Sequence, residues 1–272
     1  MKTKEIRVCI MRVGGTNCDA ETQGALEDLD VKAEVVHLNE IINRRNLLDY
    51  HALVFPGGFS YGDYVRAGAI YAKAVIAKLG DDLKQFVREE RPILGICNGF
   101  QILVEAGFLP GFQGISKSPH AALATNLPVG YRCMWIHLKH ENKGRCVFTS
   151  KIKVDAVVRI PVAHGEGRLI FKKTKQSECL KKLYEDDQMV FRYCTEQGEV
   201  AEGRFPVNPN GSFHDIAGIC DPSGTIFGLM PHPERAYFGW QQPDWTRKQR
   251  LNEYGDGKLV FESVVEHLTK KF

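Results

Sequence analysis

Cys97 lies where an apolar run typical of a strand meets the start of a predicted helix, in residues 92–101 (PILGICNGFQ). A residue on such a sharp strand-to-helix turn projects its side chain above the carboxyl edge of the sheet, and Gly95 and Gly99 allow close backbone packing around it. The N-terminus of the following helix favours the thiolate over the thiol. The segment therefore predicts a nucleophile elbow, although taken alone it also fits a cysteine simply buried at a strand end.

A histidine and a glutamate that could complete this chemistry stand late in the chain, in residues 230–235 (MPHPER). A thiol nucleophile needs a base to take its proton and a third group to orient that base. His232 follows an apolar strand and is held between two prolines, and Glu234 can point the same way in extended geometry. The carboxylate can hold one imidazole nitrogen while the other accepts a proton. We therefore predict that Cys97, His232 and Glu234 form a catalytic set.

A glycine-rich loop follows another predicted strand, in residues 55–63 (FPGGFSYGD). An acyl-transfer site needs hydrogen-bond donors at the developing oxyanion. The amides of Gly58 and of Asn98, just after the nucleophile, would supply two. The loop matches neither the P-loop nor the dinucleotide-binding glycine pattern, so the sequence predicts no nucleotide site in this chain.

Short β-rich runs alternate with helical patterns over the first hundred residues. This alternation predicts an α/β fold with a mostly parallel, doubly wound sheet and helices on both faces. The predicted strands, β-branched and closed by Gly, Asn or Pro, are 6–11, 33–38, 52–55 and 93–96. The predicted helices are 20–29, 41–48, 67–90 with a break near Gly80, and 100–106.

The middle of the chain, from about 117 to 204, changes character. Alternating segments such as 134–138 and 168–171 predict antiparallel strands added to the sheet. A charged, helix-like stretch around 177–187 lies within an insertion at about 172–197. Residues 216–220 and 226–230 flank a turn and predict a hairpin, and 258–271 predict a closing C-terminal helix. We expect residues 1–272 to form a single domain; the roles of 172–197 and of the tail after Gly239 stay open.

The composition limits the classes of function. Of 272 residues, 43% are apolar and 25% charged, which is ordinary for a globular chain with a real core. The net charge is +3 and the basic residues are spread out, so nothing indicates nucleic-acid binding. No apolar run approaches the roughly 18 residues that span a bilayer, and we expect no membrane contact and no export. Eight cysteines without a CxxC pair fit free thiols in a reducing cytoplasm.

Two other groups of residues could also carry chemistry, as a nucleophile or as metal ligands. Cys18 also follows a strand and precedes a helix, which makes it the rival nucleophile, but it lacks the flanking glycines of Cys97. We interpret 14–19 as a turn with a capping residue, which convergence of the strand ends could still bring near the site. The second group is Cys133, His137, His140 and Cys146. The spacing of these residues is poor for binding zinc, so we predict no metal site.

The elbow GICNGFQ (95–101), the Pro-Gly-Gly loop and the late His-Pro-Glu together resemble the class I, or triad-type, glutamine amidotransferases. Other stretches narrow this resemblance to one branch, the glutaminase subunits of phosphoribosylformylglycinamidine synthase, and the likeness runs from about residue 6 to residue 238. These stretches are 15–19 (GTNCD), 56–64 (PGGFSYGDY) with 66–69 (RAGA), 163–168 (AHGEGR), 208–212 (NPNGS) and 229–235 (LMPHPER).

The resemblance implies a class I glutamine amidotransferase-like fold and a role for each matching residue. The Cys97 thiolate would attack the side-chain amide of L-glutamine, with His232 as acid and base and Glu234 orienting it. Ammonia would leave, and water would then cleave the glutamyl thioester. By the same likeness Gly58 and Asn98 donate to the oxyanion, Gln101 approaches the bound glutamine and loop 164–166 holds its amino-acid end. The implied substrate-binding residues are Gly57, Gln101, His164, Gly165 and Glu166.

The resemblance also implies partners. In this family the ammonia passes to a separate, larger ATP-dependent synthetase subunit, often with a third small subunit, in de novo purine (IMP) biosynthesis. ATP, Mg²⁺ and formylglycinamide ribonucleotide would then bind the partner, this chain would carry no cofactor, and it would have low activity alone. The same Cys–His–Glu set would also suit a cysteine peptidase or another amide hydrolase. A non-catalytic regulatory module ranks last, because all three members of the set are present.

Overall fold

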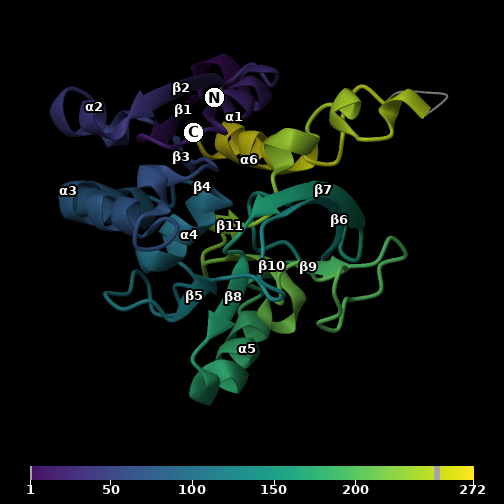
Figure 1. Cartoon of the computed structure of the whole chain (residues 1–272). Helices are drawn as coiled ribbons and strands as arrows, with labels where there is room; N and C mark the ends of the chain where they lie inside the picture. The colour runs from purple at the N-terminus through teal and green to yellow at the C-terminus, as the bar shows by residue number, and fades with distance from the viewer. Residues whose placement is uncertain (1, 248–251) are drawn as a thin grey trace.

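Nine strands form a central sheet in the computed structural model, which describes residues 2–247 and 252–272. They are β1 (Arg7–Arg12), β2 (Lys32–His37), β3 (Ala52–Phe55), β4 (Ile93–Ile96), β6 (Arg132–His140), β7 (Val157–His164), β9 (Met189–Cys194), β10 (Ile216–Cys220) and β11 (Ile226–Leu229). Their order across the sheet is β2-β1-β3-β4-β11-β10-β9-β6-β7 (Figure 1). The first five strands in this order are parallel, and the last four continue the sheet in antiparallel steps. The mostly parallel sheet with antiparallel additions is confirmed.

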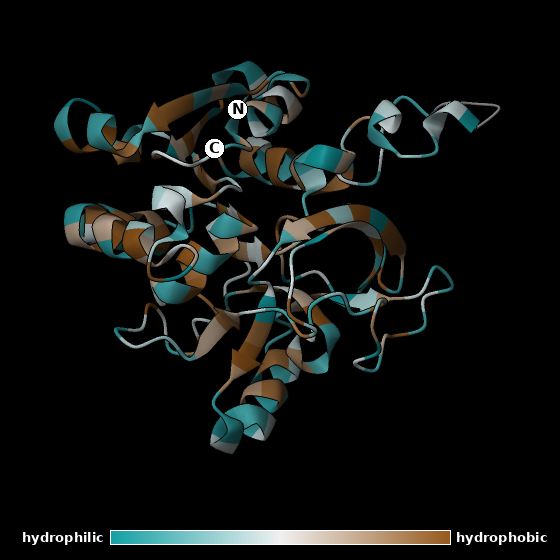
Figure 2. Cartoon of the chain, in the orientation of Figure 1, coloured by the Kyte–Doolittle hydropathy of each residue, from teal (hydrophilic) through white to brown (hydrophobic). Residues whose placement is uncertain are grey.

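Six α-helices belong to the described residues: α1 (Asp19–Glu27), α2 (Leu38–Asn43), α3 (Ala69–Arg88), α4 (Asn98–Glu105), α5 (Gln176–Glu185) and α6 (Lys258–Lys271). Helices α3 and α4 lie on one side of the parallel strands, and α1 and α6 lie on the other (Figure 1). Apolar residues gather in the strands and on the helix faces turned toward them (Figure 2). This two-sided cover explains why the parallel strands have apolar side chains on both faces.

Three expectations about the elements were wrong in detail. Helix α3 is unbroken at Gly80, because its buried stripe, which includes Val75, Leu79 and Leu83, continues past the glycine and outweighs the small cost of glycine in a helix. The helix expected at 41–48 is α2, which ends at Asn43 and is followed by a separate 3-10 turn at Leu47–Asp49. Residues 168–171 form β8 (Arg168–Phe171), which lies outside the central sheet.

Strand β8 pairs instead with β5 (Ala121–Ala124) in a two-stranded sheet. The reason is that β7 is the edge strand of the large sheet, and the chain turns away from it at residues 165–167 before β8 begins. Within the segment 172–197, α5 is followed by β9, which pairs with both β10 and β6. Residues 248–251 of the tail lie outside the described residues. None of the helices in the described ranges combines the length and apolar character needed to cross a bilayer.

Candidate active site

Cys97 occupies the sharp turn between β4 and α4. Its backbone has φ 52° and ψ −103°, a strained conformation that residues other than glycine rarely adopt. The neighbouring glycines are required by close packing: a Cβ on Gly99 would collide with the carbonyl oxygen of Phe55, and one on Gly95 would lie 2.6 Å from the carbonyl oxygen of Gly99. The local geometry is therefore that of a nucleophile elbow, with the thiol at the carboxyl edge of the sheet.

His232 and Glu234 form a buried pair beside this elbow. The 3-10 turn Pro233–Ala236 follows His232 directly, and the His232 N–H donates to the Pro161 carbonyl of β7 at 2.8 Å. Oε1 of Glu234 lies 2.6 Å from Nδ1 of His232, and both residues are at most 2% exposed. Burial alone would lower the pKa of His232, but the Glu234 carboxylate and the sulfurs of Cys97 and Cys18 raise it well above its ordinary value.

The Cys97 thiol lies near this imidazole, and its sulfur helps to raise the pKa of His232. Because Nδ1 is occupied by Glu234, Nε2 is the nitrogen left for the thiol, and within the described part of the chain this buried atom has no hydrogen-bond partner. The thiol also lies 3.6 Å from the Ala163 carbonyl oxygen at the end of β7. The structure thus brings together the three residues that the sequence singled out, Cys97 from the turn after β4 and His232 and Glu234 from the segment after β11.

The glycine loop after β3 packs against the same histidine. A Cβ on Gly57 would lie 2.8 Å from Cε1 of His232, so only glycine fits there. Gly58 has φ 149° and bridges to Thr16 through two hydrogen bonds, Asn17 N–H to Gly57 O and Phe59 N–H to Gly15 O. Neither bond uses the Gly58 amide, which leaves this N–H, like that of Asn98 at the helix start, open to a ligand.

A cavity of about 130 Å³ opens in front of Cys97. Most of the residues that the sequence marked for oxyanion or substrate binding line it, namely Gly58, Gln101, His164, Gly165 and Glu166. Gly57 is the exception among the substrate-binding candidates, since it packs against the imidazole. The small volume suits a ligand the size of one amino acid, well below the roughly 300–1,000 Å³ of sites for drug-sized molecules.

Hydrogen bonds fix the shape of this cavity. Gln101 donates from Nε2 to the Glu166 carbonyl at 2.6 Å, and its Oε1 accepts from Asn98 at 2.9 Å. The Ala67 N–H donates to Oε2 of Glu166 at 3.1 Å. His164 is almost fully buried, and burial together with nearby His232 lowers its pKa to about 3, so it is neutral near pH 7. Gln101 therefore ties the elbow helix to the loop 164–167.

Three residues of the site were missed by sequence reasoning. Asp63 lines the cavity with Glu166, and burial and that second carboxylate raise the pKa of Asp63 to about 6. Asn126 donates to the His164 carbonyl and accepts from the Gly167 N–H, both at 2.9 Å. Asn210 donates to the Gly167 carbonyl at 2.9 Å and to the Tyr193 hydroxyl at 3.0 Å. Asp63 and Asn210 belong to the segments 56–64 (PGGFSYGDY) and 208–212 (NPNGS), which the sequence analysis had noted. The sequence could have pointed to Asp63 because it is an acidic residue in a loop that is rich in glycine and aromatic residues.

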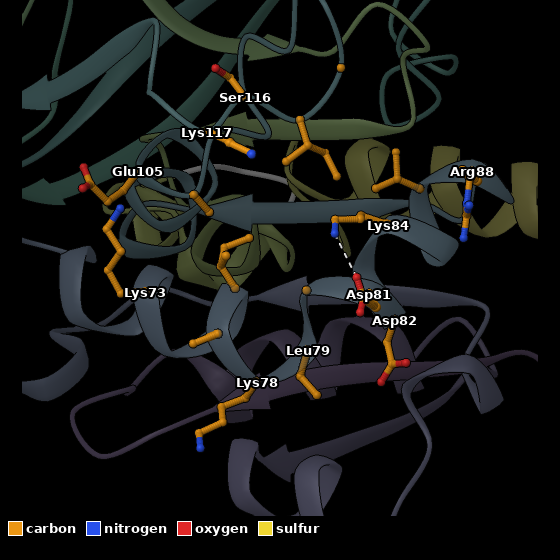
Figure 3. Close-up of a pocket in the computed structure, with 17 residues that line it drawn as sticks. Lys73, Lys78, Leu79, Asp81, Asp82, Lys84, Arg88, Glu105, Ser116 and Lys117 are labelled. Atoms are coloured by element: carbon orange, nitrogen blue, oxygen red, sulfur yellow. Dashed lines mark hydrogen bonds and ion pairs between the residues drawn. The ribbon is translucent and has the colours of Figure 1, made fainter.

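A larger hollow of about 730 Å³ lies elsewhere, between α3 and residues 105–117 (Figure 3). It contains none of the candidate catalytic or binding residues, and its charged side chains, including Lys78 and Arg88, point in different directions. Lys84 is paired with Asp81 at 2.8 Å. The hollow presents no convergent polar groups, so the candidate active site is the smaller cavity at Cys97.

Comparison with known proteins shows which family this chain resembles in sequence and in fold. Residues 5–268 match the model of the CobB/CobQ-like glutamine amidotransferase domain. Phosphoribosylformylglycinamidine synthase subunit PurQ of Archaeoglobus fulgidus is 47% identical over 99% of this chain and 100% of its own length, and that of Methanococcus maripaludis is 38% identical over 97% and 98%. A chain in the structure of PurLQS from Thermotoga maritima is 34% identical, with a TM-score of 0.72 over 97% of this chain and 99% of that one.

Proposed function

We propose roles in glutamine hydrolysis for the side chains and amides around this cavity. The chain belongs to the family of glutaminase subunits of phosphoribosylformylglycinamidine synthase and acts in purine biosynthesis. The chain is thus an enzyme of the class I glutamine amidotransferases. The observation that carries the proposal is the strained elbow at Cys97 next to the buried His232–Glu234 pair.

Cys97 attacks as a thiolate, with its proton held at Nε2 of His232. The new S–C bond forms at the side-chain amide carbon of glutamine, and the N–H groups of Gly58 and Asn98 stabilise the resulting oxyanion. His232 gives its proton to the nitrogen, the C–N bond breaks and ammonia leaves a glutamyl thioester. Water then loses a proton to His232 and attacks this thioester, which releases glutamate and restores the thiol.

Asp63 and Glu166 bind the α-ammonium group of glutamine. Two carboxylates that share a small, partly buried cavity repel each other, and a cation between them relieves that repulsion. With the ammonium group at this end, the side-chain amide reaches toward Cys97 at the other. A cysteine peptidase would need room for a polypeptide, which a cavity of about 130 Å³ does not offer.

The large synthetase subunit docks over the mouth of this cavity. Five exposed apolar residues either line the cavity or stand within two positions of a lining residue in the chain, and we call them the mouth ring: Phe59, Tyr64, Val65, Val129 and Tyr131. Phe59 and Tyr131 line the cavity and stack with ring centroids 6.4 Å apart, and Val65 is 89% exposed. An exposed apolar patch of this kind is typical of a protein interface. Docking there would keep ammonia from escaping into solvent, so we expect low activity of the chain alone.

The remaining participants follow from this arrangement. We assign ATP, Mg²⁺ and formylglycinamide ribonucleotide to the synthetase subunit, and we place a third small subunit in the same complex. The similarity to a chain of PurLQS from Thermotoga maritima supports this set of partners. Cys97 chemistry needs no cofactor in this chain. A cytoplasmic location agrees with the eight cysteines, all of which are free thiols.

The test is covalent labelling with a diazo-ketone analogue of glutamine, with and without the synthetase subunit, read by intact mass and peptide mapping. We expect label on Cys97 that glutamine blocks and the partner accelerates. Label on another residue, or none in a folded sample, would overturn the assignment of Cys97. An unchanged labelling rate with the partner present would overturn the docking proposal alone.

A further inference from the structure

Cys18, the rival nucleophile of the sequence, also lies beside the imidazole of His232. Its sulfur is 3.9 Å from Nδ1 of His232, the nitrogen that Glu234 also contacts. It does not line the cavity, and the thiol donates to Oδ1 of Asn17 at 3.3 Å. Cys18 therefore faces away from the place where a substrate carbonyl would sit, and attack on the substrate is closed to it.

A side-chain contact, a backbone hydrogen bond and close packing hold Cys18 in place. Nη2 of Arg235, the residue after Glu234, donates to the Cys18 sulfur at 3.0 Å. The Cys18 N–H donates to the Gly57 carbonyl at 3.1 Å, and a Cβ on Gly57 would come within 3.0 Å of the sulfur. Cys18 is 1% exposed and occupies the N-cap position of α1 without a side-chain capping hydrogen bond. One side chain is thus packed between the glycine loop, the catalytic histidine and a guanidinium group.

We propose that Cys18, held by Arg235, is a positioning residue that fixes the imidazole of His232 from its Nδ1 side, so that Nε2 stays directed at Cys97. The inference rests on the acid–base role proposed above for His232. Glu234 alone anchors the ring through one hydrogen bond, which permits rocking about that bond. A sulfur packed at the same edge removes this freedom, and its link to Gly57 couples the histidine to the loop that carries the Gly58 amide.

The test compares Cys18→Ala with Cys9→Ala, a matched loss of a buried thiol in the core of β1. Glutamate release by the complex with the synthetase subunit is measured as kcat, KM and pH profile, beside the Tm of each variant. We expect Cys18→Ala to lower kcat by about tenfold, a small part of the factor of about 10² to 10⁴ that general acid–base catalysis contributes. The KM for glutamine should stay within about twofold of the parent value because the cavity lining is unchanged.

The pH profile of glutamate release distinguishes a positioning role of Cys18 from a purely packing role. The titratable or charged groups around His232 are Glu234, Cys97, Cys18, His164, Tyr131 and Arg235, and only Cys18 is altered in this variant. Loss of a group that stabilises the imidazolium should move the basic limb of the profile to lower pH, which Cys9→Ala should not do. Cys18→Ser, whose hydroxyl can still accept from Arg235, should recover part of the rate.

Three outcomes decide the matter. A parental kcat and pH profile in Cys18→Ala or, should that variant fail to fold, in Cys18→Ser would overturn the inference. An equal loss of rate in Cys9→Ala would reduce Cys18 to a packing residue and overturn it as well. Glutaminase activity that survives in Cys97→Ala would instead contradict the proposed function, whatever the Cys18 variants do.

Discussion

Oε1 of Glu234 lies 2.6 Å from Nδ1 of His232, and the two side chains are buried together behind the Cys97 elbow. A carboxylate in this place selects the imidazole tautomer whose other nitrogen can exchange protons with the nucleophile. Replacing the Glu234 carboxylate by an amide of the same shape should therefore have a large effect on kcat without altering the structure of the site.

Glu234→Gln should keep the fold and lower kcat by about 10³ to 10⁴, because the amide can hold the imidazole in the wrong tautomer. Glutamate release by the assembled complex measures this effect. An unchanged Tm would show that the loss is chemical. A variant that retains more than about a tenth of the parental kcat would contradict the assigned role.

Cys97→Ala should abolish glutamine-dependent synthesis by the complex, with a loss of at least about 10⁴ in kcat, while ammonia-dependent synthesis by the partner persists. The reason is that the nucleophile serves only the release of ammonia. Both activities are measured on the same preparation with glutamine or an ammonium salt as nitrogen source. Loss of both would count heavily against the assigned role, because the partner's use of ammonia does not depend on Cys97.

Asp63→Asn should raise the KM for glutamine by about tenfold or more, since a charge-assisted hydrogen bond of about 1.5–3 kcal/mol is lost. In the parent, the KM should also rise as pH falls through about 6, where Asp63 takes up a proton. Asparagine tolerates the positive φ of 52° at this position, so the backbone should not change. A KM that is flat from about pH 5 to about pH 8 would remove Asp63 from the substrate site.

The same substitution should stabilise the protein at neutral pH. The pKa of Asp63 is higher in the folded state, about 6, than the ordinary value near 3.9, so its ionisation opposes folding. That penalty is absent below about pH 4, grows as pH rises toward about 6 and is complete above it. Asp63→Asn should therefore have a higher Tm than the parent at about pH 7.5 and an equal Tm at about pH 4. An equal Tm at both values would contradict the shift.

Val65→Asp should abolish stimulation by the synthetase subunit, because a charge would be buried in the proposed interface. Its side chain is 89% exposed in the free chain, so basal glutaminase activity should not change, and Tm should not fall because Asp tolerates the positive φ of 66° at this position better than valine does. Val154→Asp, on an exposed residue outside the mouth ring, is the matched control and should be stimulated normally. The measurement is glutamate release during titration with the partner. Normal stimulation of Val65→Asp would place the interface elsewhere.

Substitution by alanine should change stability in opposite directions at two glycines. Gly99→Ala should lower the free energy of unfolding by more than about 2 kcal/mol, since its Cβ would meet the Phe55 carbonyl. Gly80→Ala, in the middle of α3 with open space around the site of a Cβ, should raise it by about 0.5–1 kcal/mol. Urea unfolding of both variants checks the pair. Equal effects would contradict the close approach of α4 to β3.

The elbow and the parallel strands could be predicted from the sequence because their signals are local. Glycines around Cys97 and short apolar runs such as 52–55 specify short-range backbone geometry, and β3, β4 and α6 were predicted with their observed bounds. The pairing of β8 with β5 could not be predicted, since an alternating pattern states which face is buried but not which strand lies beside it. Asp63 was missed for a related reason: its neighbour Glu166 is remote in sequence.

The order of the strands also bears on how the enzyme is made. Strand β4, which ends just before Cys97, pairs on one side with β3 and on the other with β11, although residues 97–225 separate β4 from β11 in the chain. During synthesis the nucleophile therefore leaves the ribosome long before its histidine, with one edge of its strand unpaired. Nascent chains should be unable to hydrolyse glutamine until residues 226–234 have emerged, so no ammonia is released from incomplete chains.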